Sequence, residues 1–306
     1  MLNGIINIYK EPGYTSHDVV ARLRGITHQK KIGHTGTLDP DAEGVLCVCL
    51  GAATRVCDML TDATKAYEAV CLLGTVTDTQ DTSGQVLSEK PVDVSAETVR
   101  ECIAGFIGET EQIPPMYSAL KRDGKKLYEL ARAGMEIERE PRHITIYDIE
   151  IVNIDLPEVT MRVTCSKGTY IRTLCNDIGE KLGCGGCMKH LTRIRVGDFD
   201  ISTARKLSEV EELAREDRIS DVLIPVTSVF ADLPAATVNQ TGASRAMNGN
   251  LLRDSDLIFE DSGLHNTTLI SGNRFRVLGP DGFFYGIYSY DAGDEACHPV
   301  KMFLCQ

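Results

Sequence analysis

The chain has 306 residues, of which 42% are hydrophobic and 25% charged, as in an ordinary globular protein long enough for one large domain and a smaller one. No apolar run approaches the ~20 residues that span a bilayer, and no secretory signal opens the chain, so we expect a cytoplasmic protein with no membrane partner. The net charge of −12 argues, taken alone, against nucleic acid, because phosphate binding requires Lys and Arg.

The first third of the chain alternates strand-like and helix-like patterns. Residues 5–9 predict a strand, and Thr15 or Ser16 is suited to cap a helix that runs through Ile26 with helical apolar spacing. A loop rich in Gly, Thr and Pro follows. The next predicted elements are a strand at 45–50, a short helix at 53–61, a strand at 67–73 and a helix at 95–106.

The rest of the chain predicts strand pairs with inserted helices, which is typical of an α+β fold with a mostly antiparallel sheet. We expect this fold over residues 1–230, a linker around 223–234 and a small β-rich domain over 231–306. The predicted elements are an extended segment at 113–120, a turn at Asp123-Gly124, helices at 126–133, 169–182 and 208–217, and strands at 143–153, 159–165, 188–196, 268–270, 275–278, 283–290 and 300–304.

The loop over residues 33–46, GHTGTLDPDAEGVL, is the most informative segment. Pro40 disfavours the helical region for Asp39, so the carboxylate is displayed from extended backbone. Gly33, Gly36 and Gly44 allow tight turns and close approach of a ligand. A carboxylate presented in this way is suited to act as a nucleophile or base, whereas a lone Leu-Asp-Pro would be an ordinary surface turn.

Two other segments carry side chains suited to work beside a carboxylate. Arg172, in SKGTYIRT, suits bidentate pairing with a carboxylate, although a helical arginine often lies on the surface. Tyr67, after Lys65, suits stacking on a base or proton transfer, although a half-buried strand tyrosine is the ordinary alternative. His34 suits titration or contact with a phosphate or base, and equally a structural place in a turn.

Cations gather in two segments, residues 121–143 and 162–195. The second holds seven Lys and Arg against two acids. A basic face on an acidic protein is one interpretation, and solvated surface charge is the other. The seven cations are Arg162, Lys167, Arg172, Lys181, Lys189, Arg193 and Arg195.

The chain has 11 cysteines, and Cys184 and Cys187 have CxxC spacing. A lone CxxC is compatible with half a zinc site or a redox pair, but no second pair completes it, so we interpret it as incidental. No HExxH, EF-hand loop, Walker A or dinucleotide fingerprint is present in the sequence. We therefore expect no metal and no cofactor.

With these residues in view, the chain resembles the TruB-type pseudouridine synthases, the bacterial tRNA pseudouridine(55) synthases. GHTGTLDP at 33–40 is similar to the family signature. The tail over 231–306 resembles the family's small PUA-like domain. Further segments match in the family's order: Lys10–Val20, Lys65–Tyr67, Ile113–Leu120, Gly124–Tyr128, Ser166–Arg172 and Leu191–Gly197.

The resemblance implies a pseudouridine synthase domain over 1–230, an RNA-binding domain over 231–306, and tRNA as the substrate, bound by its T-arm to a monomer. The T-loop uridine at position 55 would be flipped into the pocket. Asp39 would attack the nucleotide covalently or assist cleavage through a glycal-like intermediate, Tyr67 would stack on the base and take the C5 proton, and Arg172 would pair with Asp39. Substrate contacts would come from His34, Tyr170, Leu191, Lys10 and Lys65.

Two alternatives stay open at this point. The guide-RNA-dependent pseudouridine synthases of archaea and eukaryotes share the Leu-Asp-Pro motif, although the segment around 113–128 and the lack of a long basic tail favour the stand-alone type. A non-catalytic tRNA-binding or tRNA-folding protein on the same fold is the second alternative. The presence of Asp39, Tyr67 and Arg172 argues against it.

Overall fold

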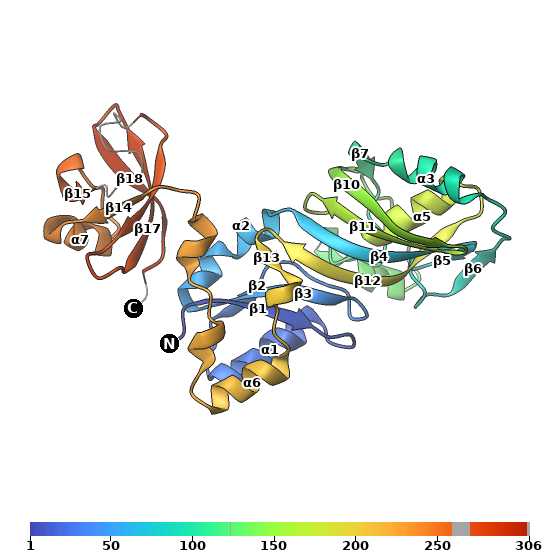
Figure 1. Ribbon diagram of the computed structural model, residues 1–306, viewed down its shortest axis with the longest axis horizontal. Coiled ribbons are helices and arrows are strands. Elements are labelled where there is room, and N and C mark those ends of the chain that lie inside the picture. Colours follow the sequence, from blue (N-terminus) through green and yellow to red (C-terminus); the bar gives the residue numbers. More distant parts are fainter. Residues whose placement is uncertain (123, 259–269, 305–306) are drawn as a thin grey trace.

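A computed structural model describes residues 1–122, 124–258 and 270–304, and its largest element is a nine-stranded sheet (Figure 1). The strand order is β1-β3-β12-β4-β11-β10-β7, with β2 beside β3 and β13 beside β12. Its strands are β1 (Gly4–Lys10), β2 (Ile32–His34), β3 (Glu43–Leu50), β4 (Lys65–Leu73), β7 (Gly108–Gln112), β10 (Arg142–Asp155), β11 (Glu158–Cys165), β12 (Gly186–Val196) and β13 (Phe199–Asp200).

Antiparallel pairing dominates this sheet, as the sequence predicts. The exception is the junction of β12 with β3, which is parallel and short, with Thr192 opposite Glu43 and Arg193 opposite Gly44. The loop before β3 therefore lies beside the middle of β12. The α+β fold class is confirmed, and the parallel junction lies next to the predicted nucleophile.

Helices cover the sheet at both ends (Figure 1). α1 (Ser16–Thr27) and α6 (Leu207–Arg215) pack on β1 and β3. α3 (Ala96–Ala104) and α5 (Ile171–Lys181) pack at the other end with β10 and β11. The predicted cap of α1 is confirmed, since the Thr15 side chain accepts a hydrogen bond from the Asp18 N–H in a capping box.

Strand β3 is buried on both faces, which explains its unbroken apolar run. Leu46, Val48 and Leu50 lie in the core beneath α1. Val45, Cys47 and Cys49 face the opposite core, together with residues of the C-terminal part of the chain. The strand that follows the Asp39 loop is therefore fixed from both sides, so the loop begins and ends on rigid structure.

Shorter elements fill the edges of the molecule. Two hairpins, β5 with β6 and β8 with β9, form separate two-stranded sheets. Their bounds, with those of the short helices, are β5 (Thr75–Thr77), β6 (Val86–Glu89), β8 (Lys121–Arg122), β9 (Lys125–Lys126), α2 (Cys57–Asp62) and α4 (Leu127–Arg132), and the 3₁₀ turns η1 (Gly51–Val56), η2 (Ile201–Thr203), η3 (Ile219–Val222), η4 (Val226–Phe230) and η5 (Asp254–Asp256).

The C-terminal part forms a five-stranded sheet in the order β15-β14-β16-β17-β18, with one helix, α7 (Figure 1). It is joined to the large sheet by apolar contacts, in which Phe230 lies 5.6 Å from Phe303 between ring centroids. Within the described residues, no helix is long and apolar enough to cross a membrane. The elements are β14 (Ala235–Val238), α7 (Gln240–Met247), β15 (Leu257–Ile258), β16 (Arg274–Leu278), β17 (Phe284–Asp291) and β18 (Ala296–Met302).

The predicted linker at 223–234 is wrong in part, because η4 lies within it and buries Val226 and Phe230. Their apolar side chains make this segment part of the core rather than a free connection. β14 and α7 are additional elements that the sequence patterns do not predict. Of the predicted turn at Asp123-Gly124, Asp123 lies outside the described residues, as does most of the strand predicted at 268–270.

Candidate active site

Asp39 lies in the loop between β2 and β3, and the N-terminal segment holds this loop. The Leu38 N–H donates to the Ser16 hydroxyl over 2.9 Å, at the start of α1. The Lys10 ammonium donates to the Pro40 carbonyl over 3.0 Å and also to the carbonyl of Ala42. The backbone on both sides of Asp39 is thereby fixed, and the carboxylate keeps a defined position.

Arg172 is the partner of Asp39. α5 begins at Ile171, slightly later than predicted, so Arg172 is its second residue. The guanidinium is buried, with its Nε 3.1 Å from Asp39 Oδ2. Its Nη1 lies 3.5 Å from Asp81 Oδ2, and its Nη2 donates to the Tyr117 carbonyl over 2.8 Å. The sequence-predicted pair therefore meets within a larger network.

Asp81 and Tyr117 are parts of this network that the sequence did not reveal. Asp81 lies in a turn-rich stretch, where an Asp normally serves the turn itself, and its Oδ1 does accept from Ser83 N–H over 3.0 Å. Tyr117 contributes only its carbonyl, which any residue type supplies. Neither local pattern carries a signal for the contact with Arg172.

The pKa of Asp39 is subject to opposing effects of burial and of neighbouring charges. Burial in the pocket raises the pKa of Asp39 above its ordinary value, and the Asp81 carboxylate raises it further. The Arg172 guanidinium opposes both effects. A carboxylate that is partly desolvated yet paired with a cation is suited to act as a nucleophile or base.

Two tyrosines lie near the Asp39 carboxylate, because burial and then the negative charge of Asp39 both raise the pKa of Tyr67 and of Tyr170. Leu38 and Leu191 belong to one buried cluster, and Tyr67 packs against it from β4. Burial raises the pKa of the Tyr67 phenol. Tyr170 precedes α5, and its N–H donates to the Gln112 side chain over 2.8 Å. The candidate site therefore combines two tyrosines, neighbouring buried leucines and one ion pair.

His34 ends β2 and faces a second histidine. Its ring lies 5.7 Å from that of His17, in an edge-to-face arrangement. Burial and the neighbouring His17 lower the pKa of His34, so the neutral ring is favoured. Its Nδ1 is buried and has no hydrogen-bond partner among the described residues. The ring is thus held at the end of β2, where the Asp39 loop begins.

Lys10 and Lys65 both direct their ammonium groups at backbone carbonyls. Lys10 is fully buried, and Lys65 donates to the carbonyls of Ala63, over 2.7 Å, and Thr61. Burial lowers the pKa of each lysine to about 8. Because their donors contact the protein itself, we expect both lysines to shape the pocket rather than to touch a nucleotide.

Five of the seven cations over 162–195 are buried or paired with an acid. Arg162 pairs with Glu68 over 2.9 Å, Lys167 pairs with Asp62 over 2.9 Å, and Lys189 pairs with Glu158. Arg172 and Arg193 are buried. These five cations argue against a continuous basic face, whereas Lys181 and Arg195 are exposed and form no ion pair among the described residues.

The cations of the other basic segment, residues 121–143, are mostly exposed and unpaired among the described residues. We define the insertion segment as residues 113–142, which carries the β8–β9 hairpin and α4. Its exposed cations form no ion pair within the described part of the chain, and Arg132 lies over the Tyr128 ring at 5.4 Å. These cations are Lys121, Arg122, Lys125, Arg132 and Arg142.

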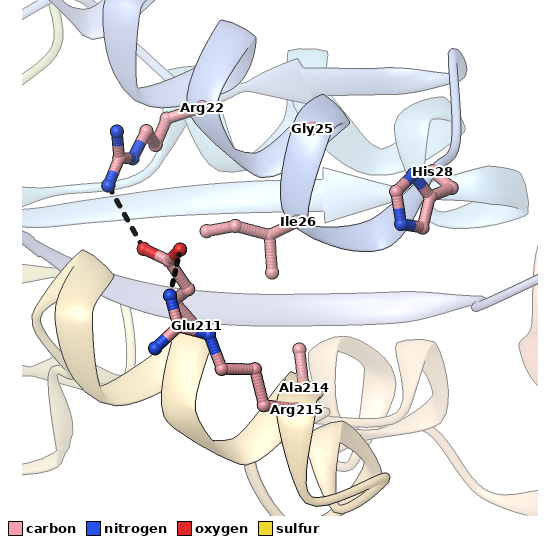
Figure 2. Close-up of a pocket in the computed structure, with 7 residues that line it drawn as sticks. All are labelled: Arg22, Gly25, Ile26, His28, Glu211, Ala214 and Arg215. Atoms are coloured by element: carbon pink, nitrogen blue, oxygen red, sulfur yellow. Dashed lines mark hydrogen bonds and ion pairs between the residues drawn. The ribbon is translucent and has the colours of Figure 1, made fainter.

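A separate surface groove lies between α1 and α6, away from these residues. Figure 2 shows Glu211 between two arginines, with hydrogen bonds of 3.0 Å from Arg22 and 2.8 Å from Arg215.

Among the described residues, no group of three or more His, Cys, Asp and Glu side chains is placed to hold a metal. Cys184 and Cys187 are buried free thiols.

Comparison with solved structures places this arrangement in a known class. The chain superposes on a chain of an H/ACA RNP bound to a substrate RNA containing 2′-deoxyuridine with a TM-score of 0.72 and 25% identity, covering 99% of this chain and 85% of the other. A chain of a Cbf5-Nop10-Gar1 complex gives a TM-score of 0.71 and 26% identity, covering 98% and 85%. The fold is that of the pseudouridine synthases.

Sequence comparison is more specific. Residues 24–171 match the TruB family pseudouridylate synthase N-terminal domain, and residues 172–231 match the tRNA pseudouridylate synthase B C-terminal domain. The chain is 49% identical to the tRNA pseudouridine synthase B of Lachnoclostridium phytofermentans over 99% of this chain and 100% of that one. That of Geobacter sulfurreducens is 45% identical, over 95% of each chain. The chain belongs to the TruB family of pseudouridylate synthases, an enzyme family, and the resemblance seen in the sequence is confirmed.

Proposed function

We propose that this protein converts the uridine at position 55, in the T loop of tRNA, to pseudouridine. The single observation that supports this most is the Asp39–Arg172 ion pair at 3.1 Å, next to the core cluster that contains Leu38 and Leu191 and against which Tyr67 packs. The relatives that span the whole chain carry the name tRNA pseudouridine synthase B. The reaction rearranges one nucleotide, so it consumes no cofactor.

The proposed chemistry assigns a role to each group. The target base leaves its stack and enters the pocket, at a cost of a few kcal/mol. Asp39 attacks the nucleotide or assists glycosidic cleavage, and Arg172 keeps its carboxylate ionised and oriented. Tyr67 stacks on uracil, and after C5 has bonded to the ribose the phenol oxygen takes the C5 proton while the phenol passes its own proton to solvent, so the neutral phenol is regenerated. His34, Tyr170 and Leu191 contact the flipped nucleotide.

We also propose that residues 1–230 form the catalytic domain and 231–306 a small PUA-like RNA-binding domain, acting as a monomer in the cytoplasm. Guide-RNA dependence is the less favoured alternative, because similarity to the H/ACA RNP chain is 25%, against 49% for a tRNA pseudouridine synthase B. A purely tRNA-binding role is less favoured, because the Asp39–Arg172 pair is intact.

The test is to incubate the purified protein with an unmodified tRNA transcript and to map pseudouridines by carbodiimide labelling and primer extension. The proposal predicts one modified position, in the T loop, without a guide RNA, and none when that uridine is replaced by cytidine. A T-arm minihelix alone should also be modified. Modification that appears only after a guide RNA is added, or none at all, contradicts the proposal.

A further inference from the structure

Arg193, in β12, is a buried cation beside the candidate active site. It is only 1% exposed and is one of the largest fully buried side chains of the protein. Unlike Arg172, it forms no ion pair with an Asp or Glu in the described ranges of the chain. Burying a charge is expensive unless it is compensated, so its contacts must be strong and specific.

Two of these contacts join Arg193 to the segment that carries Asp39. Its Nε donates to the Val45 carbonyl over 2.7 Å, and its Nη2 donates to the Gly36 carbonyl over 3.2 Å. Gly36 lies three residues before Asp39, and Val45 lies six after it. One planar guanidinium therefore contacts both ends of the loop, and these two hydrogen bonds fix the distance between the ends.

Gly44 allows this approach. Its φ is +102°, and a Cβ at this position would lie 2.3 Å from the Arg193 carbonyl oxygen. The parallel junction of β3 and β12 pairs these two residues. Because Gly44 has no side chain, the backbone of β12 at Arg193 lies directly against the backbone at Gly44. This close backbone contact does not depend on side-chain flexibility.

The third contact is with Tyr67, which lies directly opposite Arg193 in the antiparallel pairing of β4 with β12. Cross-strand partners project their side chains to the same face of a sheet. Burial raises the pKa of the Tyr67 phenol, and the Arg193 guanidinium on the neighbouring strand opposes that effect. Because a guanidinium carries only donors, we expect it to donate to the phenol oxygen.

We propose that Arg193 is a positioning residue that fixes the Tyr67 hydroxyl and the Asp39 loop relative to each other. It acts through these two groups and does not contact the RNA, since it is buried. This inference rests on the proposed function, because it assigns Arg193 to the same reaction. It also explains why a cation from a basic sequence segment lies inside the protein without a carboxylate.

The first test compares Arg193→Lys with Arg195→Lys, an exposed matched control in the same strand. We expect Arg193→Lys, which keeps the charge and loses the planar fork, to lower the single-turnover rate constant by about 10²-fold, the scale of a small misplacement of reacting groups. The Kd for tRNA should stay within about threefold, because the buried Arg193 does not contact the RNA. A threefold change corresponds to less than about 1 kcal/mol. Arg195→Lys should leave the rate constant unchanged.

A double-mutant cycle with Tyr67→Phe separates positioning from general stability. If Arg193 acts through the Tyr67 hydroxyl, the reduction in rate caused by Arg193→Lys should be much smaller in the Tyr67→Phe background. Reductions that multiply, or a rate constant for Arg193→Lys within twofold of wild type, overturn the inference. An inactive wild type would instead contradict the proposed function, so the two failures are distinguishable.

A second measurement needs no Arg193 variant and no activity. In protein labelled with ¹⁵N-arginine, Tyr67→Phe removes one oxygen from the guanidinium's surroundings. One slowly exchanging guanidinium signal should then shift, whereas the matched control Tyr147→Phe, at an exposed tyrosine, should shift none of the slowly exchanging signals. If Tyr67→Phe leaves every slowly exchanging guanidinium signal in place, the Tyr67–Arg193 contact is absent and the inference fails.

Discussion

The pocket and the insertion segment both contain charged side chains, but they differ in how these are held. In the pocket, Arg172 and Arg193 are buried, and each makes several directed contacts. In the insertion segment, Lys121 and Lys125 are exposed and form no ion pair within the described residues. Fixed charges orient reacting groups, whereas exposed charges attract an anion over a distance.

The difference predicts a division of labour. Changes in the pocket should alter the rate constant for isomerisation and leave tRNA affinity nearly intact. Changes in the insertion segment should alter affinity and its salt dependence and leave the rate constant of the bound complex nearly intact. The same residue type, Arg or Lys, therefore has different expected effects according to its burial.

The largest effect is expected for Asp39→Asn. The amide keeps the shape of the carboxylate but cannot act as a nucleophile, so the single-turnover rate constant should fall by at least about 10³-fold. Affinity for tRNA should stay within about tenfold, or about 1.4 kcal/mol. Rapid-quench assays and filter binding check the two values, and residual turnover above about one percent of wild type would remove Asp39 from the nucleophile role.

Arg172→Met should have the next largest effect. It leaves Asp39 and Asp81 near each other without their shared cation. Because the Asp39 side chain is 43% exposed, we expect the loss of stability to be smaller than the ~3–5 kcal/mol for breaking a fully buried pair. We expect the rate constant to fall by about 10²-fold or more, together with a lower melting temperature. Arg162→Met, at an exposed pair with Glu68, is the control, and equal reductions in the two variants would contradict a special role for Arg172.

The pH dependence sharpens the description of the pocket. If Asp39 must be ionised, the rate falls as pH falls through its pKa, which burial places above the ordinary value of 3.8. Asp81→Asn removes a carboxylate that raises this pKa, so the acidic limb of the pH–rate profile should move to lower pH. A shift to higher pH would mean that the limb reports another group.

The smallest effect is expected in the insertion segment. Lys121→Glu should weaken tRNA binding several-fold, and removing one phosphate interaction should flatten the plot of log K against log salt by about 0.7 to 0.9. Arg215→Glu, at an exposed arginine on α6, is the control and should change little. Binding titrations at several salt concentrations check both, and equal effects would remove the insertion segment as the electrostatic contact.

Local elements could be predicted from the sequence because their causes are local. The cap at Thr15 and the apolar spacing after it define α1, and Gly183 ends the α5 region with a φ of +81°. Asp39 and Arg172 lie far apart in the chain, and only the family resemblance predicts that they pair. No helix or strand periodicity carries information over such a separation.

The other features of the site and fold depend on long-range contacts, which the local sequence pattern does not predict. Asp81 is indistinguishable from any turn aspartate, and Arg193 from any cation of a basic strand. Their roles come from the sheet order, which sets β12 between β3 and β4. The prolines around η4 are typical of an irregular connection, so the sequence predicts a linker there. The burial of Phe230 depends on the C-terminal sheet, which the local sequence does not reveal.

The most direct test measures the rate constant and the Kd together for Asp39→Asn and Lys121→Glu on one unmodified tRNA. The division of labour predicts that Asp39→Asn loses isomerisation with near-normal affinity, while Lys121→Glu loses affinity and, at saturating protein, isomerises at the wild-type rate. An active Asp39→Asn protein, or a Lys121→Glu protein that binds normally and isomerises slowly, would contradict it.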